Sequence, residues 1–422
     1  MSKLPVLFGY EATNIGSSNG PLSHSILTKD HRSMKKHQLV IIPSVPVWVN
    51  ESGIVFERKF FDGVRMYADI WPGTITCILR RSDGRLPEFG TVAQKDVKCF
   101  FHTIVLEGKE TLSVDHLSGA SMVLASGDSF DQLHVSMLCR SAGIKCVYVI
   151  EYTPEIRSAI LQLEAMNPLI RMRRFLFLWS NERRRRAAFR IADGIQSNGT
   201  PAFNEYREFR NSMLYFDTRV DGASIIKDAE LNERLVYLDE NRPLRLAFSG
   251  RLIRMKGGDH LVEVAKRLKE AGMKFTMSIY GTGELESEMK GFISEYRLEE
   301  YVQMKGSLSF RDELLPELMG NVDVFVCLHR QGDPSCTYLE TISCGIPIVG
   351  YRNSAFHGLL GLADVGWSVQ MDDIAGVCRV IRQIDRARTL IKEKSRKSVL
   401  FARKNSAEFT SRKRIDHLLS LV

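Results

Sequence analysis

Two segments of the 422-residue chain combine glycine and basic residues in a spacing that suits a phosphorylated ligand. Residues 249–258, SGRLIRMKGG, follow a strand-like run, so Gly250 allows a tight exit before the next helix. Arg251 and Lys256 then place two cations near the amino end of that helix, where they are expected to be exposed and to seat a pyrophosphate. A solvated loop with incidental basic residues is the alternative, and the spacing is not that of a Walker A motif.

The second segment, Gly281-Thr282-Gly283-Glu284, also follows a strand-like run. It lacks the third glycine of a dinucleotide-binding fingerprint, because Glu286 stands at that position. Taken alone, Gly281 and Gly283 are typical of a plain turn between a strand and a helix.

A third segment, residues 331–340 (QGDPSCTYLE), combines a helix start with a carboxylate. Ser335 is predicted to cap the helix, which leaves its own N–H group and those of Cys336 and Thr337 free to bind an anion. Glu340 follows one to two turns later on an otherwise apolar helix. It is either a surface carboxylate or an acceptor for the hydroxyl groups of a bound ribose or sugar.

Strand-like and helix-like runs alternate around these segments. Strands are predicted at 244–249, 275–280, 301–306, 322–327 and 347–350, and helices at 258–271, 284–296, 311–319 and 335–344. In the first half, strands are predicted at 1–10, 122–126, 146–150 and 193–197 and a helix at 130–142, whereas residues 38–118 contain irregularly spaced β-like runs. This alternation requires parallel strands joined by crossovers, which is a doubly wound α/β sheet.

The pattern predicts two Rossmann-like domains that face each other across a cleft. Residues 1–220 form the first and residues 243–400 the second, with a hinge at 221–242. Residues 401–422 are expected to form a helix that packs back on the first domain. Ligands of such sheets bind at the carboxyl ends of the strands, and therefore in the cleft.

The order of these elements over residues 244–370 resembles glycosyltransferase family 4, whose members have the GT-B fold. The resemblance rests on the Gly-Arg-Leu-x-x-x-Lys-Gly loop, the Gly-x-Gly-Glu turn, Asp323 before a strand, and the helix of Glu340, which ends in Cys-Gly-Ile-Pro-Ile-Val. It implies that Arg251 and Lys256 grip the diphosphate of a nucleotide-sugar donor and that Glu340 holds the ribose of the donor.

The resemblance has one gap in this segment. The first glutamate of the family's Glu-x7-Glu pair would fall at Gly332, and Asp333 is the nearest acid that could hold the sugar hydroxyls instead. The predicted donor-binding residues are Gly16, Gly250, Gly281, Gly283, Ser335, Cys336, Thr337 and Glu340, and the predicted catalytic residues are Arg251, Lys256, Asp333 and Glu151.

Two of these residues come from the first half. Gly16 belongs to a loop of small residues at 14–22, which the resemblance places against the donor phosphate and the acceptor; a flexible surface loop is the alternative. Family members carry a histidine at the end of the strand that corresponds to 146–150, and Glu151 stands at that position here. Asp128 is a second carboxylate at a strand end.

The net charge of +8 is concentrated in two stretches. Residues 167–190 contain eight arginines and one glutamate, and residues 391–414 contain nine basic and two acidic residues. In the first stretch Asn167-Pro168 starts a helix in which arginines alternate with Phe and Trp. Arg171, Arg173, Arg174, Arg183, Arg184, Arg185 and Arg186 are predicted to face an anionic membrane or a lipid-linked acceptor; a buried helix with a charged end is the alternative.

Composition limits the location. No uninterrupted apolar run approaches the roughly 20 residues that cross a bilayer, and the first ten residues contain no secretory apolar stretch. The eight cysteines include no Cys-x-x-Cys pair and mostly stand in apolar runs, as in a reducing compartment. We therefore expect a cytoplasmic protein, or a peripheral one on the inner face of the plasma membrane.

The resemblance implies a retaining, metal-independent glycosyltransferase that uses a nucleotide-diphosphate sugar, needs no cofactor and acts in bacterial exopolysaccharide, lipopolysaccharide or capsule assembly. The chain contains no Asp-x-Asp and no Cys/His cluster with metal-ligand spacing. A non-catalytic, nucleotide-binding subunit is the alternative, because the first glutamate and the histidine are missing. A nucleic-acid binder is a third possibility, but no recognition motif supports it, and no nucleic-acid partner is expected.

Overall fold

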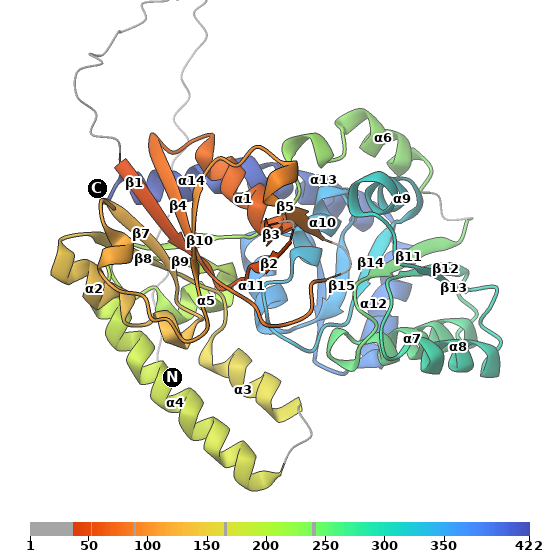
Figure 1. The fold of residues 1–422 in the computed structure, drawn as a ribbon. Coiled ribbons are helices and arrows are strands. Elements are labelled where there is room, and N and C mark those ends of the chain that lie inside the picture. Colours follow the sequence, from red (N-terminus) through yellow and green to blue (C-terminus); the bar gives the residue numbers. More distant parts are fainter. Residues whose placement is uncertain (1–36, 52, 88–89, 164–166, 239–241) are drawn as a thin grey trace, which may run out of the picture. The chain divides into compact units, whose positions relative to one another are not determined.

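The computed structural model describes residues 37–51, 53–87, 90–163, 167–238 and 242–422. The predicted strand at 1–10 and the loop that contains Gly16 lie outside these residues. Within the described residues the chain forms two parallel sheets flanked by helices (Figure 1). The predicted α/β class is therefore confirmed.

The first sheet has seven parallel strands in the order β10-β9-β8-β7-β1-β4-β6. The strands are β1 (His37–Ile42), β4 (Gly73–Arg80), β6 (His102–Leu106), β7 (Met122–Ser126), β8 (Lys145–Ile150), β9 (Gly194–Asn198) and β10 (Ser212–Tyr215). Their helices are α1 (Arg58–Ala68), α2 (Val135–Ala142), α3 (Pro154–Leu163), α4 (Pro168–Ile191) and α5 (Gly199–Tyr206). The strand order reverses between β1 and β7, and ligands of doubly wound sheets bind at this point.

The irregular β-like runs of residues 38–118 have a simple origin. Besides β1, β4 and β6 they supply a separate antiparallel sheet of β2 (Trp48–Asn50), β3 (Gly53–Glu57) and β5 (Thr91–Ala93). Parallel and antiparallel strands therefore follow one another in this part of the chain, which obscures the helix–strand alternation.

The predicted helix at 130–142 is wrong in its first half, where the chain forms a 3-10 turn at Phe130–Gln132 before α2. The hydroxyl of Tyr148 donates to the carbonyl oxygen of Gln132 at 3.0 Å and accepts from the N–H of Ser136 at 3.1 Å. The tyrosine thus occupies the place of the bond that would continue the helix from Ser136 back to Gln132.

The second sheet has six parallel strands in the order β13-β12-β11-β14-β15-β16. The strands are β11 (Leu244–Ser249), β12 (Phe275–Tyr280), β13 (Val302–Gly306), β14 (Val324–Cys327), β15 (Ile348–Tyr351) and β16 (Gly366–Val369). Helices α6 (Asp228–Val236), α7 (Gly258–Glu270), α8 (Glu286–Glu295), α9 (Leu315–Asn321), α10 (Cys336–Ser343), α11 (Ser354–Leu362), α12 (Ile374–Arg386), α13 (Thr389–Arg403) and α14 (Ala407–Leu419) complete this half. The predicted strands at 244–249 and 275–280 are confirmed residue for residue, whereas β16 was not predicted.

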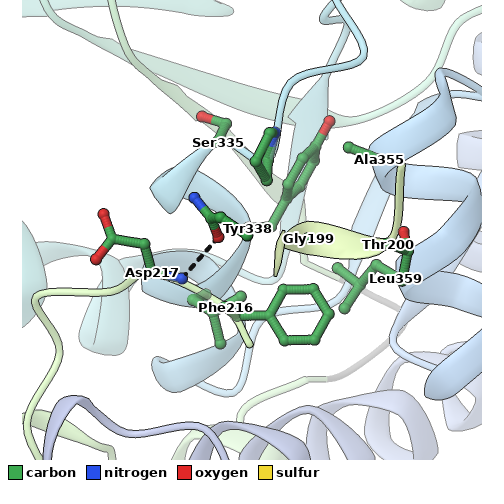
Figure 2. A pocket seen from close by; sticks show the side chains of 11 residues that line it. Gly199, Thr200, Phe216, Asp217, Ser335, Tyr338, Ala355 and Leu359 are labelled. Carbon is green, nitrogen blue, oxygen red and sulfur yellow. Dashed lines mark hydrogen bonds between the residues drawn. The ribbon is translucent and has the colours of Figure 1, made fainter. Parts of the chain in front are cut away.

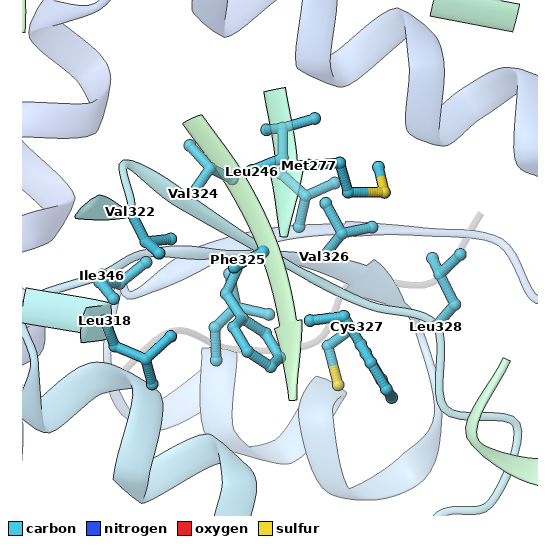
Figure 3. Packing of buried hydrophobic residues seen from close by; sticks show 14 of the residues in the cluster. Leu246, Met277, Leu318, Val322, Val324, Phe325, Val326, Cys327, Leu328 and Ile346 are labelled. Atoms are coloured by element: carbon cyan, nitrogen blue, oxygen red, sulfur yellow. The ribbon is translucent and has the colours of Figure 1, made fainter. Parts of the chain in front are cut away.

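The core of the second half surrounds β14. All four residues of this strand are at most 1% exposed, and their side chains pack with Leu246, Met277, Leu318 and Ile346 (Figure 3). A strand that is buried on both faces reads as an uninterrupted apolar run, which is why the sequence marks it clearly. The rigid strand fixes the starting point of the polar loop 328–335 that follows.

The last helix contributes to the other core. Ile415 and Leu418 of α14 belong to the apolar cluster around the first sheet. The guanidinium of Arg414 donates to Gln196 Oε1 at 2.7 Å, which adds a polar contact to β9. The precise domain boundaries stay a prediction.

Glycines allow the loops after β11 and β12 to lie side by side. A Cβ atom on Gly281 would lie 2.0 Å from the carbonyl oxygen of Gly250, and one on Gly283 would lie 2.4 Å from that of Leu252. Backbone bonds then join the two loops, from Leu252 N–H to Thr282 O at 2.9 Å and from Leu285 N–H to Leu252 O at 3.0 Å. These glycines therefore have a packing role, and their predicted donor-binding role stays a prediction.

We expect Gly283→Ala to destabilise the fold by about 1–3 kcal/mol, because the new methyl group would overlap a backbone oxygen that cannot move alone. The matched control is Gly291→Ala in α8, where a Cβ atom would meet nothing within 4 Å. That change should stabilise the helix by about 0.5–1 kcal/mol. Chemical denaturation of both variants measures the difference, and equal stabilities would contradict the close loop contact.

Candidate functional site

Lys256 and Asp333 form a buried ion pair at the carboxyl ends of β11 and β14. The Lys256 ammonium lies 3.5 Å from Asp333 Oδ2, and the two side chains are 11% and 15% exposed. The prediction that Lys256 is exposed is wrong. The adjacent Gly257, with φ of 75°, lies so close to Leu328 that a Cβ atom would be 2.3 Å from the Leu328 carbonyl oxygen, and this contact carries Lys256 inward. Arg251, earlier on the same loop, is exposed.

Polar groups beside this pair lack hydrogen-bond partners among the described residues. They are Asp333 Oδ1 and both ring nitrogens of His329, a residue that is 1% exposed. Burial lowers the pKa of His329 well below its usual range, and the charge of Lys256 lowers it further, so the ring is neutral. A buried acceptor without a donor is costly, and a ligand hydroxyl would satisfy it.

The amino end of α10 lies directly after this pair. Ser335 stands at the N-cap position, and its hydroxyl donates to Thr337 Oγ1 at 3.2 Å. Its N–H donates to the carbonyl oxygen of Asp333 at 2.8 Å, so the prediction of a free N–H at Ser335 is wrong. Cys336 and Thr337 begin the helix, and their N–H groups lie in its first turn, where an intrahelical acceptor is missing.

Gly332, where a family glutamate was expected, lies against the start of α11. A Cβ atom on Gly332 would be 2.1 Å from Ser354 Oγ, and this hydroxyl donates to the Gly332 carbonyl oxygen at 3.2 Å. The packing therefore leaves no space for a longer side chain without moving Ser354.

Glu340 is a buried partner of Arg219 rather than a surface carboxylate. The two side chains are joined by a bond of 2.7 Å from Arg219 Nε to Glu340 Oε1, and Glu340 is 9% exposed. The guanidinium also lies 3.6 Å from the centre of the Phe310 ring. The glutamate is thus held by a cation from the segment that joins the two halves of the chain.

Side chains of the first half approach the same helix. Lys59 in α1 donates to Asp217 Oδ2 at 2.7 Å and contacts the Cys336 sulfur at 3.6 Å. Asn198 donates to Glu151 Oε2 at 3.0 Å and accepts from the N–H of Asp217 at 2.9 Å. These contacts link the strand ends of the first sheet to the start of α10.

The narrow crevice at this junction is lined by both halves of the chain, among them Gly199 and Phe216 from the first half and Ser335 and Tyr338 from the second (Figure 2). Its volume is about 10 Å³. The lining residues are Asn198, Gly199, Thr200, Phe216, Asp217, Pro334, Ser335, Tyr338, Leu339, Ala355 and Leu359.

The electrostatics of the junction are unusual. Burial raises the pKa of Glu151 to about 7, although the amide of Asn198 favours the charged form. Burial likewise raises the pKa of the Cys336 thiol to about 11. The charges of Asp217 and Glu151 raise this pKa further, whereas that of Lys59 lowers it. Glu151 is therefore close to half-protonated near neutral pH, a state suited to exchanging a proton or a hydrogen bond with a ligand hydroxyl.

Asp128 has a different role from Glu151. Its carboxylate accepts from the N–H groups of Glu151 and Tyr152 at 2.9 and 3.1 Å and pairs with Arg157 at 2.5 Å. These bonds hold the backbone of the loop after β8. Asp128 therefore positions Glu151, and both of its oxygens accept hydrogen bonds.

The arginines of α4 divide into two groups. Arg185 is 3% exposed, donates to the Gly127 carbonyl oxygen at 2.7 Å and pairs with Glu182 at 2.5 Å. Arg186 pairs with Glu182, Glu205 and Glu208. The prediction that these two face a membrane or acceptor is wrong, because Arg185 attaches α4 to the loop after β7 and Arg186 attaches it to α5 and the residues that follow. Arg173, Arg174, Arg183 and Arg184 are exposed, and Arg171 is half-buried.

A larger cavity of about 240 Å³ lies at the carboxyl ends of β1 and β4, next to the reversal of strand order. Its polar lining includes Arg80, Arg81, Asp131, Gln132 and His134. Arg80 lies 3.7 Å from Asp131, so charges of both signs line the space. Such a lining suits a polyhydroxylated ligand.

Several site residues carried no sequence signal. Lys59, Asn198, Asp217, Arg219 and Phe310 reach the site from separate elements and form no local motif. Only the fold brings them together. Asp217 and Arg219 follow β10, a strand that the sequence did not mark.

Comparison with known proteins identifies part of the chain. Residues 232–398 match the family model described as glycosyl transferases group 1. WcaL of Escherichia coli, named as a colanic acid biosynthesis glycosyltransferase, is 28% identical over 137 residues, which are 31% of this chain and 33% of WcaL. AmsK of Erwinia amylovora, an amylovoran biosynthesis glycosyltransferase, is 25% identical over 150 residues, 34% of this chain and 36% of AmsK. The match thus spans about a third of each relative.

The fold has solved counterparts over nearly its whole length. HepE of Anabaena, solved in complex with UDP, superposes with a TM-score of 0.64 at 13% identity, covering 92% of this chain and 100% of that one. At this identity the likeness concerns the fold alone. It confirms the predicted GT-B arrangement.

The raised pKa of Glu151 predicts a pH-dependent stability. Its pKa is about 7 in the folded protein and 4.5 ordinarily, so between these values the folded state holds a proton that the unfolded state has released. Stability attributable to this group therefore falls as pH rises from 4.5 to 7. Glu151→Gln, which cannot ionise, should remove a penalty of up to about 3 kcal/mol at pH 8 and have little effect at pH 4. Denaturant titrations of both proteins at the two pH values test this, and a constant difference between them would contradict the assignment.

Proposed function

We propose, from the match of residues 232–398 to the family model described as glycosyl transferases group 1, that the protein transfers a sugar from a nucleotide-diphosphate donor to a saccharide acceptor. The buried Lys256–Asp333 pair carries this proposal. It lies at the strand ends beside the open start of α10 and leaves Asp333 Oδ1 without a donor among the described residues. A cation for a phosphate and an acceptor for a sugar hydroxyl therefore stand side by side.

The donor diphosphate would be held by positive charge from three sources. These are the Lys256 ammonium, the exposed Arg251 guanidinium and the N–H groups at the start of α10. Such groups stabilise a departing diphosphate without reorganisation, so we propose metal-independent transfer. Retention of the anomeric configuration is part of the proposal and rests on the family resemblance.

The acceptor would bind on the side of the first sheet. Glu151 lies there within the junction, and the cavity of about 240 Å³ provides space for a saccharide. The names of WcaL and AmsK concern exopolysaccharide biosynthesis. On this basis we propose a role in bacterial surface-polysaccharide assembly, including lipopolysaccharide or capsule, with a lipid-linked acceptor at the inner face of the plasma membrane.

A non-catalytic, nucleotide-binding subunit is the second candidate. Two observations favour it. Of the two carboxylates of the family's Glu-x7-Glu pair, one is bound to Arg219 here and the other is replaced by the glycine at position 332. Such a protein would bind the nucleotide without turnover. Measuring donor hydrolysis or transfer alongside nucleotide binding separates the two functions.

Replacing the buried cation should abolish transfer. Lys256→Met keeps the length of the side chain and removes its charge, so we expect the transfer rate to fall at least about 100-fold. Arg254→Met is the matched control, because Arg254 stands two residues earlier in the same loop but pairs with Glu288 at 2.9 Å. The control should retain most activity. Since Lys256→Met also leaves Asp333 unpaired, chemical denaturation of Lys256→Met shows whether a loss of transfer reflects unfolding, and normal transfer by this variant would refute the site.

Changing the ribose carboxylate should weaken nucleotide binding. Glu340→Gln keeps the shape of the side chain but accepts weaker hydrogen bonds from hydroxyl groups and from Arg219. We therefore expect the Kd of nucleoside diphosphates to rise about tenfold. Thermal-shift titration with UDP, GDP and ADP measures this and also selects the base. Glu288→Gln serves as a surface control. An unchanged Kd for the preferred nucleotide would mean that Glu340 does not touch it.

A further inference from the structure

The outer surface of α4 carries an unusual number of exposed apolar side chains. Six of the sixteen large hydrophobic residues that are exposed in the described part of the chain lie on this one helix, each between 50% and 67% exposed. They are Leu169, Ile170, Met172, Leu176, Phe177 and Trp179. Figure 1 shows the first half of α4 extending away from the sheets beside α3. Packing within the described residues leaves each of these residues at least half exposed.

Their spacing places them on a continuous face. Leu169, Met172, Leu176 and Trp179 follow one another at intervals of three or four residues, which aligns them along the helix. Arg183 continues the row, with its guanidinium 4.9 Å from the centre of the Trp179 ring. Phe177 packs edge-on against Phe130 at 5.6 Å, and Phe130 is itself 54% exposed. The apolar surface therefore extends from α4 to the loop after β7.

The charge on this face has one sign. The single carboxylate of α4, Glu182, is bound to Arg185 and Arg186 on the side that packs against the first sheet. Arg173, Arg183 and Arg184 are exposed among the apolar residues. The α4 part of the surface therefore presents arginines and large apolar side chains without a carboxylate, and Asp131 beside Phe130 lies 3.7 Å from Arg80. Such a surface is complementary to a layer of anionic headgroups above hydrocarbon.

We propose that this face of α4, together with Phe130, docks on the surface of an anionic lipid bilayer. The apolar side chains enter the boundary between headgroups and acyl chains, while the arginines bind lipid phosphates. No helix of the described residues is long and apolar enough to cross a membrane, so α4 lies along the surface. Contact with a second copy through the same face would set arginine against arginine, which makes lipid the better occupant.

The docked orientation would serve the proposed transfer reaction, on which this one consequence rests. Ser129 and Asp131, which flank Phe130, line the cavity of about 240 Å³ assigned above to the acceptor. A bilayer against Phe130 would therefore bring the headgroup layer to the cavity. A lipid-linked saccharide could enter it while its lipid stays in the membrane.

Vesicle sedimentation of the full chain tests the docking surface directly. The probes are vesicles of phosphatidylcholine alone and of phosphatidylcholine mixed with phosphatidylglycerol. Arg173→Ser/Arg183→Ser/Arg184→Ser should lower the partition coefficient for the anionic vesicles about 100-fold, since each arginine near such a surface contributes about fivefold. Leu176→Ser/Trp179→Ser should lower it at least about tenfold for both vesicle types by removing the apolar anchor.

Matched controls separate this face from overall charge and hydrophobicity. Arg396→Ser/Lys404→Ser/Arg412→Ser removes three exposed cations from the C-terminal helices, and Leu400→Ser/Phe409→Ser removes two apolar side chains that are 57% and 52% exposed there. Both controls should bind vesicles like the unaltered protein. The α4 variants should keep the nucleotide-induced thermal shift, so loss of membrane binding and failure of the donor site are distinguished.

Three outcomes would overturn the proposal. In the first, the α4 variants partition onto vesicles as strongly as the unaltered protein. In the second, the C-terminal control variants lose as much vesicle binding as the α4 variants. The third is an absence of vesicle binding with a dimer in sedimentation velocity that the α4 changes convert to monomer. This last result would identify the face as an interface between copies of the chain.

Discussion

The contact between Gly257 and the backbone of Leu328 determines where the charges of the site lie. It brings the loop after β11 against the chain that leaves β14, and so buries Lys256 beside Asp333. An ion pair removed from water holds its geometry strongly, because breaking it leaves one charge uncompensated. The neutral His329 and the start of α10 are then fixed around this pair. The position of these charges therefore depends on close backbone packing as well as on their mutual attraction.

The opposite side of the site is organised by hydrogen bonds between carboxylates and amides. Asp128 holds the backbone of Glu151, and Asn198 joins Glu151 to the Asp217 backbone, while Lys59 reaches from Asp217 to Cys336. These groups come from α1, from β9 and from the segments that follow β7, β8 and β10. Since each is bonded to a neighbour from another element, the protonation of Glu151 depends on how the first half of the chain packs against α10.

The sequence reveals the centre of the second sheet well because β14 and β15 are buried on both faces. Arg251, Lys256, Asp333 and Glu340 stand in local motifs, which made them visible. The motifs do not predict whether a side chain is buried or which residue it binds, because the burial of Lys256 and the bond of Glu340 to Arg219 depend on distant segments. The arginine run of α4 shows the same limit. Arg185 and Arg183 are two residues apart, yet one is a core anchor and the other is exposed.

The bond between Arg219 and Glu340 connects the site to the segment between the two halves of the chain. Arg219 belongs to the chain that leads from β10 toward α6, and its guanidinium rests on Phe310 while holding the glutamate. Within the described residues Arg219 binds Glu340 through Oε1. A ligand hydroxyl bound at this carboxylate would either use the remaining lone pairs or replace the guanidinium. In the second case nucleotide occupancy would loosen one tether of the connecting chain. Movement between the halves would then be coupled to the loading state of the active centre.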